Sequence, residues 1–63
     1  MSPLKNKSVL ILDDSKAMRD MLRVHLSNIG VNDVSQAERV PDAMRAVRAR
    51  AFNVILCDYN LGE

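Results

Sequence analysis

Cysteine and histidine are almost missing from this chain, which has one residue of each type among its 63 residues. A single thiol rules out an internal disulfide, and one cysteine with one histidine cannot build a zinc site of the usual kind. Aromatic residues are also scarce, at 3% of the sequence. A small domain of this size therefore has no covalent or zinc staple of its own and depends on its apolar core.

Long apolar runs and an excess of one charge sign are absent as well. The longest apolar runs have four residues, far too few to span a bilayer, and residues 1–7 lack the apolar core of a signal peptide. A net charge of +1 gives no strong attraction to nucleic acid or to anionic membranes. We therefore expect a cytoplasmic protein with no direct nucleic-acid partner and no membrane partner, and a single thiol fits a reducing compartment.

What is present is an alternation of strand and helix patterns. Residues 8–12 form a continuous apolar run, which predicts a strand buried on both faces. Residues 15–29 carry apolar side chains at helical spacing, and Gly30 is placed to end that helix in a left-handed conformation. A short strand over 33–36, a helix over 40–50 and a third strand over 53–57 complete the pattern. The apolar stripes of the two helices contain Met18, Met21, Leu22, Leu26 and Ile29, then Ala43, Met44 and Val47.

The order β-α-β-α-β predicts an α/β fold, because connections of this length join parallel strands by helical crossovers. Right-handed crossovers with strand order 2-1-3 would put the two helices on opposite faces of the sheet. In this order the first crossover runs in one direction along the sheet and the second runs in the other. That reversal opens a crevice at the carboxyl ends of the first and third strands, which is where open α/β sheets bind ligands.

Aspartates follow both of those strands. Asp13 and Asp14 come directly after the first apolar run, and Asp58 comes directly after the run at 54–57. Three clustered carboxylates repel one another unless a cation lies among them or one carries a proton, so the pattern indicates a divalent-metal site, a phosphoryl-transfer site, or both. The plainer alternatives are that Asp14 or Ser15 caps the first helix and that Asp58 is a turn residue.

This arrangement resembles the receiver domain of response regulators, the CheY-like module of two-component signalling. The resemblance rests on an acidic pair after one strand and a lone aspartate after the third, and it covers the chain from Ser8 onward. The matching residues are Val9-Leu10-Ile11-Leu12-Asp13-Asp14-Ser15, Met18-Arg19, Leu22, and Val54-Ile55-Leu56-Cys57-Asp58. The implied fold is a truncated flavodoxin-like one.

The resemblance also implies roles for particular residues. Asp58 would accept a phosphoryl group from a histidine kinase or phosphotransfer protein. Asp14 would be a direct ligand of Mg²⁺, Asp13 an outer-shell or water-mediated one, and Asn60 would offer its backbone carbonyl. Such a phosphoacceptor catalyses its own phosphorylation and hydrolysis but is not ordinarily counted as an enzyme.

Departures from the family pattern are as informative as the matches. A whole receiver is about twice as long, so we interpret residues 1–7 as a polar lead-in and residues 8–63 as the N-terminal half of a receiver. Leu61-Gly62 also stands where Met-Pro is common in the family. We expect weak Mg²⁺ binding at best, an incomplete switch, and self-association through the exposed edge of the third strand.

Two other functions compete with this hypothesis. One is a receiver-like module that acts by protein contact and does not accept phosphate. The other is an enzyme. A dinucleotide-binding enzyme is disfavoured because no glycine-rich turn follows the first strand. A phosphohydrolase with an aspartate nucleophile is disfavoured because that class usually spaces its strand-end acids one residue apart, whereas Asp13 and Asp14 are adjacent. We expect no chemistry from Cys57, His25 or the methionines, and interpret Cys57, Met18, Met21 and Met44 as core. The basic residues Arg39, Arg45, Arg48 and Arg50 are expected to form a solvated face.

Overall fold

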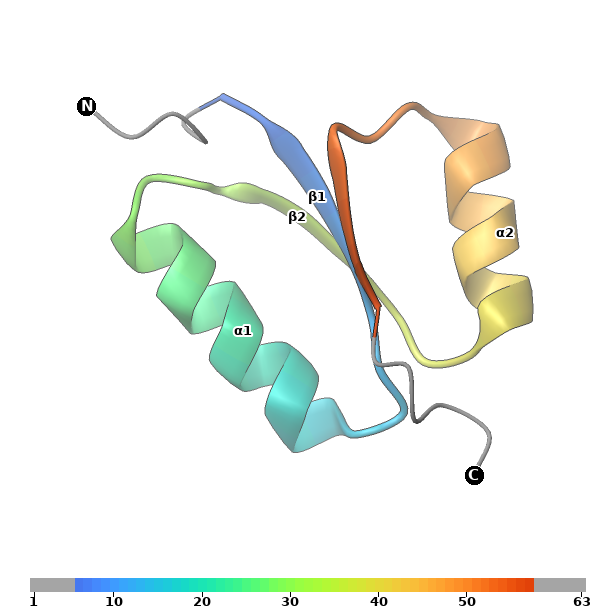
Figure 1. The fold of residues 1–63 in the computed structure, drawn as a ribbon, viewed down its shortest axis with the longest axis horizontal. Coiled ribbons are helices and arrows are strands. Elements are labelled where there is room, and N and C mark those ends of the chain that lie inside the picture. The colour runs from blue at the N-terminus through green and yellow to red at the C-terminus, as the bar shows by residue number, and fades with distance from the viewer. Residues whose placement is uncertain (1–5, 58–63) are drawn as a thin grey trace.

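The computed structural model describes residues 6–57, which form one parallel three-stranded sheet with a helix on each face. The element order is β1 (Ser8–Leu12), α1 (Lys16–Asn28), β2 (Asp33–Ala37), α2 (Val40–Ala49) and β3 (Val54–Cys57). The strand order in the sheet is β2-β1-β3, and Figure 1 shows α1 and α2 on opposite sides of the strands. The predicted fold class and strand order are confirmed.

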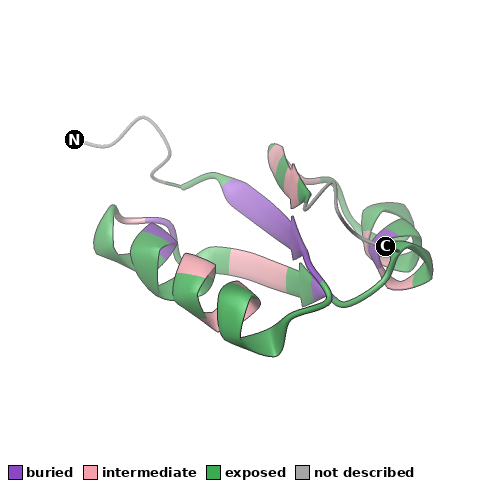
Figure 2. Cartoon of the chain, turned by 60° about the horizontal axis from the view of Figure 1, so that its bottom comes forward, coloured by how far each residue is buried: buried purple, intermediate pink, exposed green. Residues whose placement is uncertain are grey.

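The core is divided between the two faces of β1, the central strand. All five residues of β1 are buried, and Figure 2 shows that burial concentrates along this strand. Successive side chains point to opposite faces, so β1 supplies both halves of the core. The cluster on the α1 side contains Val9, Ile11, Leu26 and Val31, and the cluster on the α2 side contains Leu10, Leu12, Ala37 and Ala43.

Helix α1 is capped at both ends. The Ser15 hydroxyl oxygen accepts a hydrogen bond from the Met18 backbone N–H at 3.2 Å, which makes Ser15 the N-cap. At the other end, Gly30 has φ 93°. Its N–H donates to Ser27 O at 3.0 Å, and the Val31 N–H donates to Leu26 O at 2.8 Å. This pair of bonds needs a left-handed residue after the helix, which glycine adopts without a steric cost.

The amino-terminal edge of the sheet is tied by polar side chains. Asn53 Oδ1 accepts hydrogen bonds from the Ser8 N–H at 2.9 Å and from Ser8 Oγ at 3.2 Å. Arg50 donates to both carboxylate oxygens of Asp33, at 3.0 and 2.6 Å, and lies over the Phe52 ring at 4.9 Å. These hydrogen bonds hold the pKa of Asp33 below its usual value and raise the pKa of Arg50.

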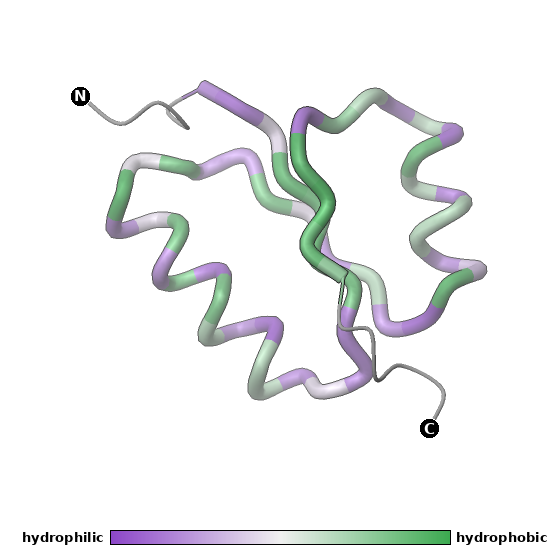
Figure 3. Tube along the Cα trace, viewed as in Figure 1, coloured by the Kyte–Doolittle hydropathy of each residue, from purple (hydrophilic) through white to green (hydrophobic). Residues whose placement is uncertain are grey.

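Four side chains predicted to be buried are instead exposed. Met18, Met21 and Met44 are 41%, 44% and 46% exposed, because each helix turns only a narrow strip of its surface toward the sheet. Cys57 is exposed as well. Helix α2 packs mainly against β1 and β2, and β3 alternates between half-buried and exposed residues. In Figure 3, β3 has the colour of hydrophobic residues, although two of its four residues are exposed.

Candidate functional site

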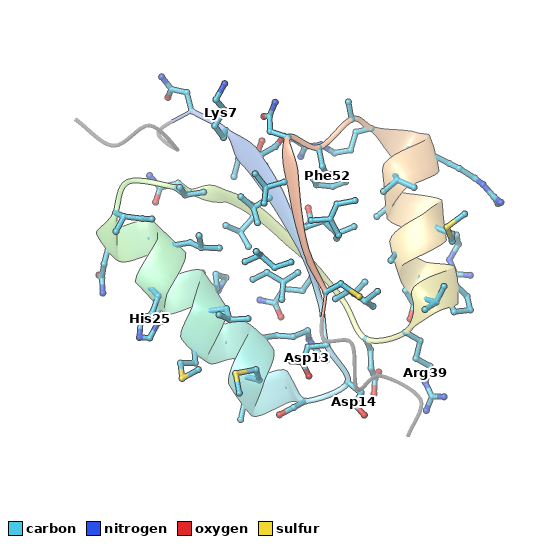
Figure 4. The ribbon with its side chains drawn as sticks, viewed as in Figure 1. Lys7, Asp13, Asp14, His25, Arg39 and Phe52 are labelled. Atoms are coloured by element: carbon cyan, nitrogen blue, oxygen red, sulfur yellow. The ribbon has the colours of Figure 1, made fainter. Side chains whose placement is uncertain are left out.

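The carboxyl ends of β1 and β3 lie side by side. The two strands pair in parallel from Val9 opposite Val54 to Leu12 opposite Cys57. Asp13 and Asp14 follow Leu12, and Figure 4 shows both at this end of the sheet, where α1 begins. The other two predicted site residues, Asp58 and Asn60, lie outside the described residues.

Asp13 is held at both its main chain and its side chain. Its N–H donates to Ala37 O at 3.1 Å, which continues the β1–β2 ladder by one residue beyond the strand. Its Oδ1 accepts a hydrogen bond from the Ser15 N–H at 2.9 Å, a local turn that aspartate forms readily. Because the residue is only 6% exposed, its carboxylate is a fixed acceptor at the base of the loop.

Asp14 lies next to this fixed carboxylate but is exposed and not engaged in the same way. Within residues 6–57 its side chain makes no hydrogen bond and no ion pair. The alternative reading of Asp14 as the helix cap is wrong, because Ser15 fills that position. The turn therefore presents one anchored carboxylate and one uncompensated one, both with the oxygen ligands that hard divalent cations prefer.

Arg19 is a residue of this site that the sequence analysis did not assign. Its Nη1 donates to the Asp13 backbone oxygen at 2.7 Å, and its Nε donates to Gln36 Oε1 at 3.2 Å. The side chain is half-buried, and its two hydrogen bonds link α1 to the acidic turn and to β2. The available signal was an arginine in the second turn of the helix that follows the acidic pair, although its helical position is equally typical of a solvated face.

The remaining titratable residues do not join the acidic pair. His25 is exposed on α1, away from Asp13 and Asp14 (Figure 4). Among residues 6–57, no three histidine, cysteine, aspartate or glutamate side chains come together. The third acid of the predicted cluster, Asp58, is beyond that range.

The basic face predicted for α2 is exposed, as expected. Arg45 forms an ion pair with Asp42, and Arg50 pairs with Asp33. Two of the four arginines therefore have carboxylate partners, which favours a solvated face. In the described part of the chain, neither helix has the length and apolar character needed to cross a membrane.

Comparison with known proteins gives a consistent result. Residues 9–63 match the family model of the response regulator receiver domain. The chain is 32% identical over 59 residues to the transcriptional regulatory protein YvrH of Bacillus subtilis, covering 94% of this chain and 25% of that relative. It is 36% identical over 56 residues to the chemotaxis protein CheY1 of Helicobacter pylori, covering 87% of this chain and 45% of that relative. The chain thus spans less than half the length of these relatives.

Proposed function

This chain belongs to the response regulator receiver domains, and from that premise we propose that it is a phospho-accepting module of two-component signalling. Asp58 is the proposed acceptor, and a histidine kinase or phosphotransfer protein is the proposed donor. The observation that carries the proposal is the parallel pairing of β1 with β3, in which Leu12 lies opposite Cys57. An aspartate follows each member of that pair in the sequence, which supports a shared acidic site.

The carboxylates at the end of β1 fit a bound Mg²⁺. Asp14 is exposed and without a protein partner in residues 6–57, which suits a direct ligand. Asp13 uses Oδ1 for the Ser15 N–H, so its Oδ2 is suited to accept a hydrogen bond from a metal-bound water. Asn60 is the proposed source of a backbone carbonyl ligand. When bound, Mg²⁺ would offset the negative charge of the carboxylates and of the transferring phosphoryl group.

The proposed reaction is a single displacement at phosphorus. An Asp58 carboxylate oxygen forms a bond to phosphorus, giving an acyl phosphate, while the bond from phosphorus to the donor histidine nitrogen breaks. The histidine nitrogen keeps the electron pair of the broken bond. On the protein side the requirement is positioning and charge compensation, because phosphoryl transfer needs little other help from the protein.

Intact-mass measurement tests the acceptor role. The whole natural protein that carries this sequence is incubated with Mg²⁺ and a small acyl-phosphate donor. We expect a gain of one phosphoryl group, which Asp58→Asn abolishes and which Asp42→Asn, in the first turn of α2, leaves unchanged. A wild-type protein that gains no mass would instead support a module that acts by protein contact alone.

A Mg²⁺ titration of the chain followed by NMR tests the metal site. We expect the largest amide shifts at Asp13, Asp14, Asp58 and Asn60. A titration that leaves these amides unmoved would contradict the site.

The exposed edge of β3 supports a further proposal, that two copies of the chain associate through this strand. β3 pairs with β1 on one side, and within residues 6–57 no strand pairs with its other side. Ile55 of this strand is 51% exposed, and an apolar edge strand favours pairing with another chain. Sedimentation should show a dimer that Ile55→Lys weakens, while a monomer at high concentration would contradict the proposal.

The cytoplasmic location stays a prediction that rests on the single thiol and on the signalling role proposed here. Expressing the whole natural protein with a fluorescent tag in cells would test it. Tagged protein confined to the cell envelope would contradict it.

A further inference from the structure

The Arg19 side chain lies against the acidic turn without belonging to it. Its Nη1 reaches the Asp13 backbone oxygen at 2.7 Å, a short distance for a hydrogen bond from a charged donor. Its Nε is anchored on Gln36 Oε1 at 3.2 Å. Gln36 belongs to β2, where it lies opposite Ile11 of the central strand, so the guanidinium is held from the sheet while it holds the turn.

The atom that Arg19 contacts belongs to the peptide unit between the two acids. The Asp13 carbonyl and the Asp14 N–H share one plane, so a bond to that oxygen restricts the rotation of the whole unit. The Asp13 N–H is already bonded to Ala37 O. With both ends of the Asp13 main chain held, the direction in which the Asp14 carboxylate leaves the turn is restricted as well.

We propose that Arg19 is a positioning residue for divalent-metal binding, which acts by fixing the Asp13–Asp14 peptide plane. This inference rests on the metal site proposed above and adds a residue to it. Mg²⁺ demands near-octahedral geometry with little tolerance, so an acidic turn that rotates loses affinity. Partners that orient metal ligands from outside typically change affinity by about 10- to 100-fold when they are removed.

Loss of the Arg19 charge and loss of its hydrogen bonds predict opposite changes in Mg²⁺ affinity. A guanidinium near the acids repels a cation, so removing its charge alone would tighten Mg²⁺ binding. Removing a positioning bond would weaken it. Arg23 lies one turn further along α1 and is exposed, and Arg23→Met therefore removes a neighbouring charge without removing a bond to the turn.

The experiment compares the 63-residue chain with Arg19→Met, Arg19→Lys and Arg23→Met by Mg²⁺ titration, followed through the Asp14 amide. We expect roughly 10-fold weaker binding for Arg19→Met, partial recovery for Arg19→Lys, and unchanged or slightly tighter binding for Arg23→Met. A second readout needs no metal. Hydrogen exchange of the Ser15 amide, which Asp13 Oδ1 accepts, should accelerate in Arg19→Met and stay unchanged in Arg23→Met.

Equal or tighter Mg²⁺ binding by Arg19→Met, with Ser15 exchange unchanged, would overturn the inference. If the wild-type chain bound no Mg²⁺ at the acidic pair, the proposed metal site would fail, and the Ser15 exchange would still decide whether Arg19 holds the turn. Circular dichroism confirms that each variant is folded. Should Arg19→Met unfold, Arg19→Lys and Gln36→Leu carry the comparison, since each weakens the hydrogen bonds of Arg19 while the positive charge at position 19 is kept.

Discussion

Polar side chains at the two ends of the sheet differ in whether they have partners within the chain. At the amino end, Asn53 accepts from Ser8, and Arg50 engages both oxygens of Asp33. At the carboxyl end, Asp14 has no hydrogen-bond or ion-pair partner among residues 6–57. A polar group whose partner is another residue of the same chain contributes to stability. A carboxylate without one, at the edge where open α/β sheets bind ligands, suits an external cation.

This contrast separates stability from binding in a measurable way. Substitutions at the amino end should change the free energy of unfolding and leave Mg²⁺ affinity alone. Substitution of Asp14, which has no partner among residues 6–57, should do the reverse. Variants from both ends are therefore measured for both the free energy of unfolding and the affinity for Mg²⁺.

Asp14→Asn should have the largest effect. Loss of a charged direct ligand is expected to reduce Mg²⁺ affinity by on the order of 100-fold, about 2.7 kcal/mol. Stability should be unchanged or slightly higher, because one of two adjacent like charges is removed. Calorimetric Mg²⁺ titration and urea unfolding measure the two quantities, with Asp42→Asn on α2 as the control for Mg²⁺ affinity. Equal affinities for Asp14→Asn and Asp42→Asn would remove Asp14 from the site.

Asn53→Ala should have an intermediate effect, on stability alone. The Ser8 N–H and hydroxyl would lose the oxygen that accepts both, and a partly buried donor without a partner costs about 1–2 kcal/mol. Urea unfolding at neutral pH measures the loss, and Asn28→Ala, which truncates an exposed amide at the end of α1, serves as the control. A drop in Mg²⁺ affinity would show that the two ends of the sheet are coupled.

Arg50→Gln should have the smallest effect, visible mainly as a change in pH dependence. The pKa of Asp33 lies below its usual value of 3.8, chiefly because of the hydrogen bonds from Arg50. That contribution to stability is present above the unfolded-state pKa and is lost as pH falls through the lower folded-state pKa. Stability of the wild type should therefore fall more steeply than that of the variant below about pH 4.

Thermal unfolding from pH 6 to pH 2 measures this difference, and added salt should narrow it, since the pair is exposed. Arg48→Gln, in the last turn of α2 just before Arg50, is the matched control. Parallel profiles for Arg50→Gln and the wild type would mean that the pair at the amino end contributes nothing to stability.

Local signals predicted most of the fold. The apolar run of β1 ends where the structure ends it, at Leu12, because an uninterrupted run followed by two aspartates allows no other boundary. Gly30 marked the end of α1 for a reason confined to its own backbone. The helix bounds differ by one residue at each end of α1, where Ser15 and Ile29 are caps.

What could not be predicted depends on distances between elements. Cys57 and Met44 have the same apolar character as buried residues, and their exposure follows from how far α2 reaches across the sheet. Arg19 has the spacing of a solvated residue, and its contact with Asp13 exists only because α1 packs back against the strand ends. The acidic pair itself was predictable, since two residues that follow one strand need no long-range information to be placed together.

Three consecutive residues in the turn between β1 and α1 have three different structural roles. Asp13 braces the loop, Asp14 projects outward, and Ser15 starts the helix. Shortening this tripeptide by a single position would force one side chain to perform two incompatible tasks. The length of this loop is thus as little open to variation as the identity of its three residues.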